Sequence, residues 1–323
     1  MMQSYTVFRH GNSVRVYAVA LLAISLAACG QAFAGTIYVL GSPSGNGNNL
    51  TTNFGSIDTA TGRYTLISGT INGTGAGATV SNLAWSGSGT TFYTFASTGG
   101  NTTLRTLTTT GTTVSASIGT TGVTIGGAAF DTSSSILYAY DKTNEDWVSI
   151  NTGNGAKTII NNNPGAGFGT PIGGRLAYHS GTMFLVSPRG SPNPQESAFG
   201  RMSNPITSNT TSYISIATGT SFRDMVIASD GTNLYGLVAV TTGTALLYSI
   251  DTANGALTKV SDVTPVSGST LPLQFNGAAC AIVVPEPSTI ALAVSGIAFI
   301  AAGMRRIGRP MALRQASAWR GGS

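Results

Sequence analysis

One short phrase recurs three times in this chain and limits what the chain can fold into. The phrase reads Ile-Asp/Asn-Thr-x-x-Gly, is followed by a strand-like run, and occupies residues 57–67, 150–160 and 250–260. Asp or Asn caps a tight turn with its side chain, and Gly accepts the positive φ that such a turn requires. Each copy therefore predicts a β-hairpin.

A second phrase combines small and apolar residues, a polar turn and an aromatic strand. Its copies are Leu83-Ala84-Trp85 before Phe92-Tyr93, Ala128-Ala129-Phe130 before Leu137-Tyr138, Leu176-Ala177-Tyr178 before Met183-Phe184, and Met225-Val226-Ile227 before Leu234-Tyr235. Together the two phrases define units of 45–53 residues that start near Asn82, Gly127, Arg175, Asp224 and Gly277. Four strands in a repeat of this length are typical of a β-propeller blade.

The two ends of the repeat region predict how the ring closes. Residues 276–283 supply only one strand after the fifth start, and residues 36–67 supply three strands before the first start. One blade would then be completed by both chain ends, which removes an open sheet edge. We expect an all-β fold with five four-stranded blades. Six blades, a β-sandwich pair and an irregular β-solenoid remain as alternatives, because the register of residues 98–125 and 187–216 is ambiguous.

The composition supports this fold class and excludes one class of partner. Only 8% of the residues are charged, and 43 glycines accompany many Ser, Thr and Asn, all of which are poor helix formers. The formal charge of +5 belongs to the chain ends, because residues 35–284 carry nine basic and ten acidic side chains, a net charge of −1. Nucleic-acid binding therefore has no electrostatic basis.

The N-terminus has the three regions of a secretory signal peptide. Arg9 and Arg15 precede an apolar run over residues 16–28, and Ala32-Phe33-Ala34 forms a small-x-small cleavage site for signal peptidase. We expect residues 1–34 to be removed. An alternative remains, because Leu26-Ala27-Ala28-Cys29 resembles the lipobox of bacterial lipoproteins, which would leave Cys29 as a lipidated N-terminus.

The C-terminus has a rigid segment, an apolar segment and a basic cluster in that order. Pro285, Glu286 and Pro287 form an extended stretch, residues 289–304 are almost wholly apolar, and a cluster of arginines follows, namely Arg305, Arg306 and Arg309. The apolar run is shorter than the roughly 20 residues that a full span prefers. The arginines would stop transfer and hold the end in the cytoplasm.

This order resembles the PEP-CTERM sorting signal of Gram-negative bacteria. The resemblance covers residues 284–309 and implies a transient membrane helix over 289–304, recognition by an exosortase, and release to the cell surface. It also implies a producer that makes an extracellular polysaccharide matrix. The basic tail over residues 310–323 departs from the pattern, because family members mostly end soon after the arginines. The alternative is a membrane anchor that stays in place.

The region between the two ends offers few groups for catalysis or metal binding. His179 is the one histidine left after signal removal and Cys280 the one cysteine, so neither a zinc site nor an intramolecular disulfide is expected. We predict no metal and no cofactor. Residues 141–146 gather oxygen ligands for calcium, but they lack the spacing of an EF-hand loop and are interpreted as a solvated turn.

A glycosidase would need carboxylates that converge on the propeller axis. Asp224, on an innermost strand, and Asp131, at a strand end, are the candidates, whereas Glu145 and Glu196 are predicted to lie in loops. The proline-rich loop over residues 187–196 interrupts the blade pattern and is a candidate contact surface.

The sequence thus predicts four parts: a signal peptide over 1–34, a propeller over 35–284, a sorting signal over 285–309 and a basic tail over 310–323. The expected function is that of an exported surface protein without enzymatic activity that binds extracellular polysaccharide or other matrix components. The alternative is a secreted carbohydrate-active enzyme on a five-bladed propeller.

Overall fold

The computed structural model of the protein describes residues 35–42, 52–71, 79–98, 101–144, 146–161, 175–188, 196–203, 212–218, 225–241 and 244–281. These residues form strands, turns and loops, and no helix long and apolar enough to span a membrane lies among them. The chain divides into two compact units, Met1–Ile282 and Val283–Ser323, and the described residues all belong to the first. The predicted signal peptide, sorting signal and basic tail lie outside the described residues.

Three blades are separate four-stranded antiparallel sheets whose strands pair in chain order. Blade 1 contains β4 (Thr79–Trp85), β5 (Thr91–Thr98), β6 (Asn101–Thr108) and β7 (Gly119–Thr120). Blade 2 contains β8 (Ile125–Asp131), β9 (Ile136–Asp141), β10 (Asp146–Ile150) and β11 (Lys157–Asn161). Blade 3 contains β12 (Arg175–His179), β13 (Thr182–Pro188), β14 (Glu196–Ser203) and β15 (Ser212–Thr218).

The other two blades share one eight-stranded sheet. Blade 4 contains β16 (Met225–Ser229), β17 (Leu234–Thr241), β18 (Thr244–Ile250) and β19 (Leu257–Pro265). Blade 5 contains β20 (Gln274–Ala281), β1 (Thr36–Ser42), β2 (Asn53–Asp58) and β3 (Arg63–Ser68). The last described strand, β20, is thus the innermost strand of blade 5 and pairs antiparallel with the first described strand, β1, with Thr36 opposite Ala281. The clasp predicted from the chain ends is confirmed.

Blades 4 and 5 are joined at their outer edges as well. β19 and β3 pair in parallel through Thr264 and Arg63, and the Thr264 amide donates to the Gly62 carbonyl over 3.0 Å. This pairing was not predicted. It covers two outer edges that would otherwise be open, and it reinforces the ring at the place where the chain ends meet.

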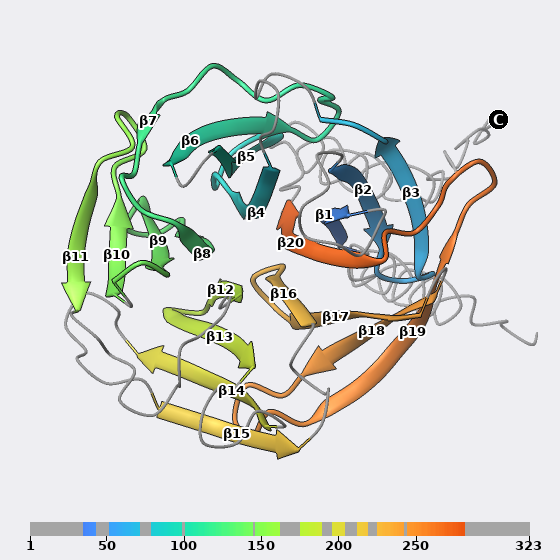
Figure 1. The fold of residues 1–323 in the computed structure, drawn as a ribbon. Coiled ribbons are helices and arrows are strands. Elements are labelled where there is room, and N and C mark those ends of the chain that lie inside the picture. The colour runs from blue at the N-terminus through green and yellow to red at the C-terminus, as the bar shows by residue number, and fades with distance from the viewer. Residues whose placement is uncertain are drawn as a thin grey trace, which may run out of the picture. The chain divides into compact units, whose positions relative to one another are not determined.

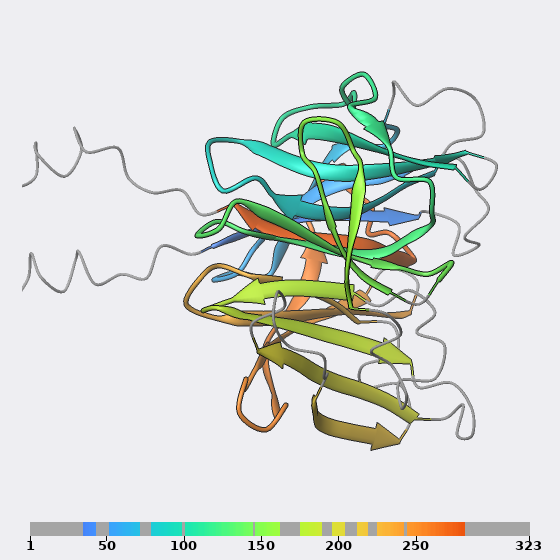
Figure 2. The ribbon, with the colours of Figure 1, turned by 90° about the vertical axis from the view of Figure 1, so that its left-hand side faces the viewer.

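The five innermost strands form a closed ring, as Figure 1 shows from along the axis and Figure 2 from the side. β4 neighbours β8, β8 neighbours β12, β12 neighbours β16, β16 neighbours β20, and β20 neighbours β4. The protein is therefore a five-bladed β-propeller. The alternatives of six blades, a β-sandwich and a β-solenoid are excluded.

Five buried hydrophobic clusters lie between successive blades and hold the ring together. Each cluster contains an alanine of one innermost strand, and each of these alanines lies opposite an aromatic residue of the second strand. The five pairs are Ala84–Tyr93, Ala129–Tyr138, Ala177–Phe184, Ala228–Tyr235 and Ala279–Tyr38. A small residue beside the axis leaves room for a large one further out, where the wedge between two blades widens. The packing therefore repeats five times around the axis.

The three predicted hairpin turns are confirmed. They join β2 to β3, β10 to β11 and β18 to β19, and each ends on a glycine with positive φ: Gly62 at 67°, Gly155 at 72° and Gly255 at 73°. In the first turn the Asp58 carboxylate accepts hydrogen bonds from the amides of Ala60 and Thr61, both over 2.9 Å. The Asx-and-glycine chemistry of the repeated phrase therefore explains the hairpins directly.

Candidate functional site

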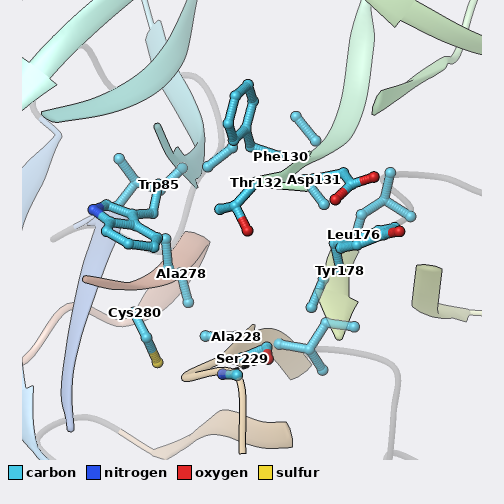
Figure 3. Close-up of a pocket in the computed structure, with 18 of the residues that line it drawn as sticks. Trp85, Phe130, Asp131, Thr132, Leu176, Tyr178, Ala228, Ser229, Ala278 and Cys280 are labelled. Carbon is cyan, nitrogen blue, oxygen red and sulfur yellow. Dashed lines mark hydrogen bonds between the residues drawn. The ribbon is translucent and has the colours of Figure 1, made fainter. Parts of the chain in front are cut away.

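A cavity of about 250 Å³ lies on the propeller axis and is the candidate site. All five innermost strands contribute to its wall, and so do the turns that follow β8, β12 and β16. Figure 3 shows the side chains arranged around it. Because ligand sites in proteins are concave, largely apolar and few, an axial cavity with a small set of polar groups is where binding is expected.

The residue after each repeated alanine gives the cavity two unlike sides. In blades 1, 2 and 3 this position holds Trp85, Phe130 and Tyr178, whereas in blades 4 and 5 it holds Ser229 and Cys280. In Figure 3 the three rings lie along one arc of the wall, and the two small residues lie opposite them. The aromatic side chains of three blades therefore face the small side chains of the other two blades across the cavity.

A hydrogen-bonded carboxylate lies beside the aromatic arc. Asp131 ends β8, is only 3% exposed, and accepts hydrogen bonds from the Ser133 amide, the Ser133 hydroxyl and the Ser134 hydroxyl. Burial alone would raise the pKa of Asp131, but the hydrogen bonds from Ser134, Ser133 and Tyr178 outweigh it and lower the pKa below its ordinary value. Burial and the bond to Asp131 raise the pKa of Tyr178 to about 12. At neutral pH this corner therefore holds a carboxylate and a neutral phenol.

The remaining titratable groups near this end of the axis leave it without a positive charge among the described lining residues. His179, the last residue of β12, shares a 2.9 Å hydrogen bond between its Nδ1 and the Ser229 hydroxyl and packs its ring on Phe184. Burial lowers the pKa of His179, so the imidazole is neutral at neutral pH. Asp230, which follows β16, adds a second carboxylate close by and caps its own turn through the Thr232 and Asn233 amides.

Side chains of the described residues narrow the opposite end of the axis. Arg175, the first residue of β12, donates from its guanidinium to the carbonyl of Met225 over 2.9 Å and to that of Phe275 over 3.2 Å. It therefore ties together the beginnings of three innermost strands. Only about 10 Å³ of free space remains beside it, roughly room for one water molecule.

Close backbone contact between two blades narrows this end further. A Cβ on Gly277 of β20 would lie 2.8 Å from the Cα of Asn82 of β4, so only glycine fits there. The Asn82 side chain in turn donates to the Ile125 carbonyl of the next blade over 3.4 Å. Among the described residues, the axial space is consequently a pocket that opens at one end and is narrowed at the other.

The structure brings one predicted carboxylate to the cavity. Asp131 lines it at a strand end, as predicted, whereas Asp224 and Glu145 lie outside the described residues. Among the residues that are described, no group of three or more His, Cys, Asp or Glu side chains could hold a metal ion. Cys280 is buried on the cavity wall, and burial raises its pKa well above the ordinary value.

Two loop predictions are wrong in part. Glu196 begins β14, and β13 continues to Pro188, so the strands of blade 3 extend into both ends of the proline-rich segment. His179 is the last residue of β12. Strand pairing between β13 and β14 overrides the local preference of proline and glutamate, and Pro188 lies at a strand end, where its missing N–H is tolerated.

The segment that begins at Asp141, predicted from the sequence to be a solvated turn, is built as a hydrogen-bonded structural corner. The Asp141 side chain is fully buried, and it accepts from the Thr143 and Asn144 amides, from the Asn144 side chain and from Lys157 Nζ at 2.7 Å. Its oxygens are therefore engaged by donors of the protein itself. The prediction of a turn is confirmed for residues 142–144, but Asp141 and Asp146 are buried strand ends and are not solvated as predicted.

The sorting residues lie outside the described residues, so their roles stay predictions. They are Ala32, Ala34, Pro285, Glu286, Pro287, Arg305, Arg306 and Arg309. Sequence reasoning did not find the cavity residues Trp85, Phe130 and Tyr178 as a set. The available signal was their common place directly after the repeated alanine, which becomes visible only when the repeats are aligned strand by strand.

No protein-family model and no curated protein matches the chain. Solved structures with a similar arrangement include TolB from Acinetobacter baumannii, with 11% identity, 85% of this chain and 74% of that chain covered, and a TM-score of 0.45. The nidogen/laminin complex matches with 16% identity, coverage of 77% and 86%, and a TM-score of 0.44. The Niastella koreensis GH74 enzyme matches with 20% identity, coverage of 75% and 39%, and a TM-score of 0.39. Likenesses this distant carry no information about function, which is argued below from the cavity alone.

Proposed function

We propose that this protein is exported to the cell surface and binds extracellular polysaccharide there without transforming it, with the axial cavity as its binding site. The cavity is the observation that carries the proposal. An aromatic arc of Trp85, Phe130 and Tyr178 lies beside the hydroxyl groups of Thr132 and Ser133. Aromatic rings stack on the apolar faces of sugar rings, and hydroxyls satisfy the sugar's own hydroxyls.

The chemistry of the described lining favours binding over catalysis. Asp131 is the carboxylate in that lining, and its oxygens already accept hydrogen bonds from Ser133, Ser134 and Tyr178. Glycoside hydrolysis ordinarily needs two carboxyl groups on opposite sides of the scissile bond, one of them with a raised pKa. The lowered pKa of Asp131 suits a fixed hydrogen-bond acceptor and does not suit a proton donor.

Export is proposed on the sequence of the two chain ends. The signal peptide over 1–34 and the sorting segment over 285–309 would deliver the propeller to the surface of a Gram-negative cell through signal peptidase and an exosortase. Both predicted targeting segments lie outside the described residues, so the proposal of export is argued from the sequence.

Binding is tested by co-sedimentation of the full-length protein, in detergent, with exopolysaccharide isolated from the producing strain. Trp85→Ala is expected to reduce the bound fraction. Ile159→Thr is the matched control, because Ile159 is 48% exposed and lies on β11, the outermost strand of blade 2, away from the axial cavity. Equal retention of the Trp85→Ala variant and the unmodified protein would remove the cavity from the proposal, and no retention of either would remove polysaccharide binding.

Export is tested by cell fractionation of the producing strain. Replacing Pro285, Glu286 and Pro287 together by alanine is expected to hold the protein in the inner-membrane fraction, while the unmodified protein reaches the surface or the medium. Unchanged surface delivery would show that the motif does not act as a sorting signal. A lipidated Cys29 in the mass spectrum of the mature protein would overturn cleavage after Ala34.

A further inference from the structure

The one-ended shape of the axial cavity restricts which part of a polysaccharide can enter it. The mouth opens among Thr132, Gly181 and Gly231, in the turns after β8, β12 and β16. The floor is formed by Arg175, Asn82 and Gly277, where about 10 Å³ remains free. A sugar in the interior of a chain is linked on both sides, and the narrowed inner end leaves no room for the polymer to continue beyond the cavity. A terminal sugar is linked on one side only, so it can enter from the mouth while the rest of the polymer stays outside.

The size of the cavity restricts the ligand to a small group. Its volume of about 250 Å³ lies below the usual range of roughly 300–1,000 Å³ for drug-sized ligands. The floor arginine cannot move aside cheaply, because it donates to the Met225 and Phe275 carbonyls of two other blades. The space therefore suits one sugar ring, with the rest of the polymer outside.

The charge around the mouth selects against acidic sugars. Asp131 remains ionised at neutral pH because its hydrogen bonds lower its pKa, and Asp230 contributes a second carboxylate near His179 and Tyr235. The described lining contains no Lys or Arg to pair with an anion. A uronate or a sulfated sugar would meet like charge at short range in a half-buried site, which is unfavourable.

We infer that the axial cavity binds the terminal residue of a glycan chain, and that this residue is an uncharged sugar. This inference rests on the proposed function and deepens it. It assigns recognition to chain ends and excludes the repeating interior of the polymer. Trp85 forms the stacking surface, Tyr178 is held in place by its hydrogen bond to Asp131, and Arg175 narrows the inner end.

Tryptophan fluorescence reports occupancy of the cavity directly. The chain has three tryptophans, and a full-length Trp147→Phe/Trp319→Phe background leaves Trp85 as the single fluorophore. The probes are the methyl glycosides of N-acetylglucosamine, rhamnose, glucose and glucuronic acid. Titration of Trp85 emission is expected to show each neutral glycoside binding at least about tenfold more tightly than the glucuronide at neutral pH. Equal affinity for the glucuronide and the neutral glycosides would overturn the charge argument.

The end-binding claim is tested with the polymer itself. Partial hydrolysis of the producer's exopolysaccharide raises the number of chain ends per unit mass, so the affinity per unit mass should rise in proportion to the ends. An affinity that is independent of chain length would overturn end recognition. If binding is independent of length and also insensitive to Trp85→Ala, it occurs elsewhere on the propeller, and polysaccharide binding by the protein survives without the cavity.

Variants separate stacking from loss of the fold. Trp85→Phe retains a ring and is expected to lie between the unmodified protein and Trp85→Ala in affinity by calorimetry. Tyr178→Phe retains the ring, removes the hydroxyl bonded to Asp131, and should weaken binding without shifting the preference among neutral sugars. A thermal midpoint within the range of the Ile159→Thr control shows that each variant is folded. The glycoside series on the unmodified protein tests the inference even if a variant fails to fold.

Discussion

Arg175 is expected to hold the closed end of the ring together, and its removal should be the most costly polar substitution near the axis. Its guanidinium donates to the Met225 and Phe275 carbonyls at 2.9 and 3.2 Å, and so links β12 with β16 and β20. A hydrogen bond from a charged donor contributes about 1.5–3 kcal/mol, so the loss of two bonds should cost about 3 kcal/mol or more. The two carbonyls would also lose their donor in a confined place.

The measurement is thermal unfolding followed by circular dichroism at neutral pH. For a domain of this size, 1 kcal/mol shifts the midpoint by about 2–4 °C, so Arg175→Ala should lower it by about 6–12 °C. Arg175→Lys should recover part of this loss, because an ammonium supplies a charge but lacks the planar fork that reaches two carbonyls. Arg63→Met is the control, because Arg63 is exposed at the start of β3.

A second readout links the same substitution to binding. Removing the Arg175 side chain opens the floor beside the roughly 10 Å³ space, so the preference for chain ends over polymer interior should weaken in Arg175→Ala. A midpoint within about 2 °C of the Arg63→Met control would refute the reasoning on stability. An unchanged preference for chain ends in a folded Arg175→Ala protein would refute the reasoning on the floor.

Three further predictions concern contacts elsewhere in the ring. Gly277→Ala should destabilise the protein by about 1–3 kcal/mol, because its Cβ would lie 2.8 Å from the backbone of β4; Gly69→Ala, where nothing lies within 4 Å, should not, and chemical denaturation compares the two. The pKa of Asp141 is lowered in the folded protein, against burial, by Lys157 and Asn144, so its contribution is present above about pH 4 and lost as the pH falls through the lowered value. Thermal midpoints between neutral and acid pH should therefore fall more steeply for the unmodified protein than for Asp141→Asn. Gly35 lies beside Asp230, because a Cβ built on Gly35 would be 3.5 Å from the Asp230 carboxylate. Cleavage after Ala34 would leave a positively charged α-amino group on Gly35, where it can pair with this carboxylate. The cleaved protein should therefore be more stable than one with an N-terminal extension. Asp230→Asn should abolish that difference in thermal midpoint, and a difference that persists would contradict the pairing.

The hairpins and the number of blades could be predicted from the sequence because their causes are local. The Asp58, Asn151 and Asp251 turns each depend on residues within one short phrase, and the structure reproduces all three. The clasp was predictable by counting strands at the two chain ends. Each of these steps needs only strand and turn chemistry, together with the tendency of sheets to avoid open edges.

The parallel pairing and the floor of the cavity depend on residues far apart in the chain, and local reasoning could not predict them. Thr264 pairs with Arg63 across about two hundred residues, and Arg175 meets Phe275 across one hundred. Arg175 was named at the start of a repeat, but a side chain at a strand start can point in several directions. Only the placement of three blades around one axis decides that its guanidinium closes the ring.

The asymmetry of the cavity follows from the way the repeats differ. The five Ala–aromatic pairs are the common part, and they fix the distance of each blade from the axis. The next position contacts the preceding blade as well as the cavity: Phe130 packs on Tyr93 with ring centroids 5.5 Å apart, and Tyr178 stacks on Tyr138 at 6.0 Å. Three blades place a ring there, and two place Ser229 and Cys280. Five aromatic residues would fill the axial space, and five small ones would leave it without a stacking surface. The division of three against two leaves a space with one aromatic wall, which is the property that a binding site for a sugar ring requires.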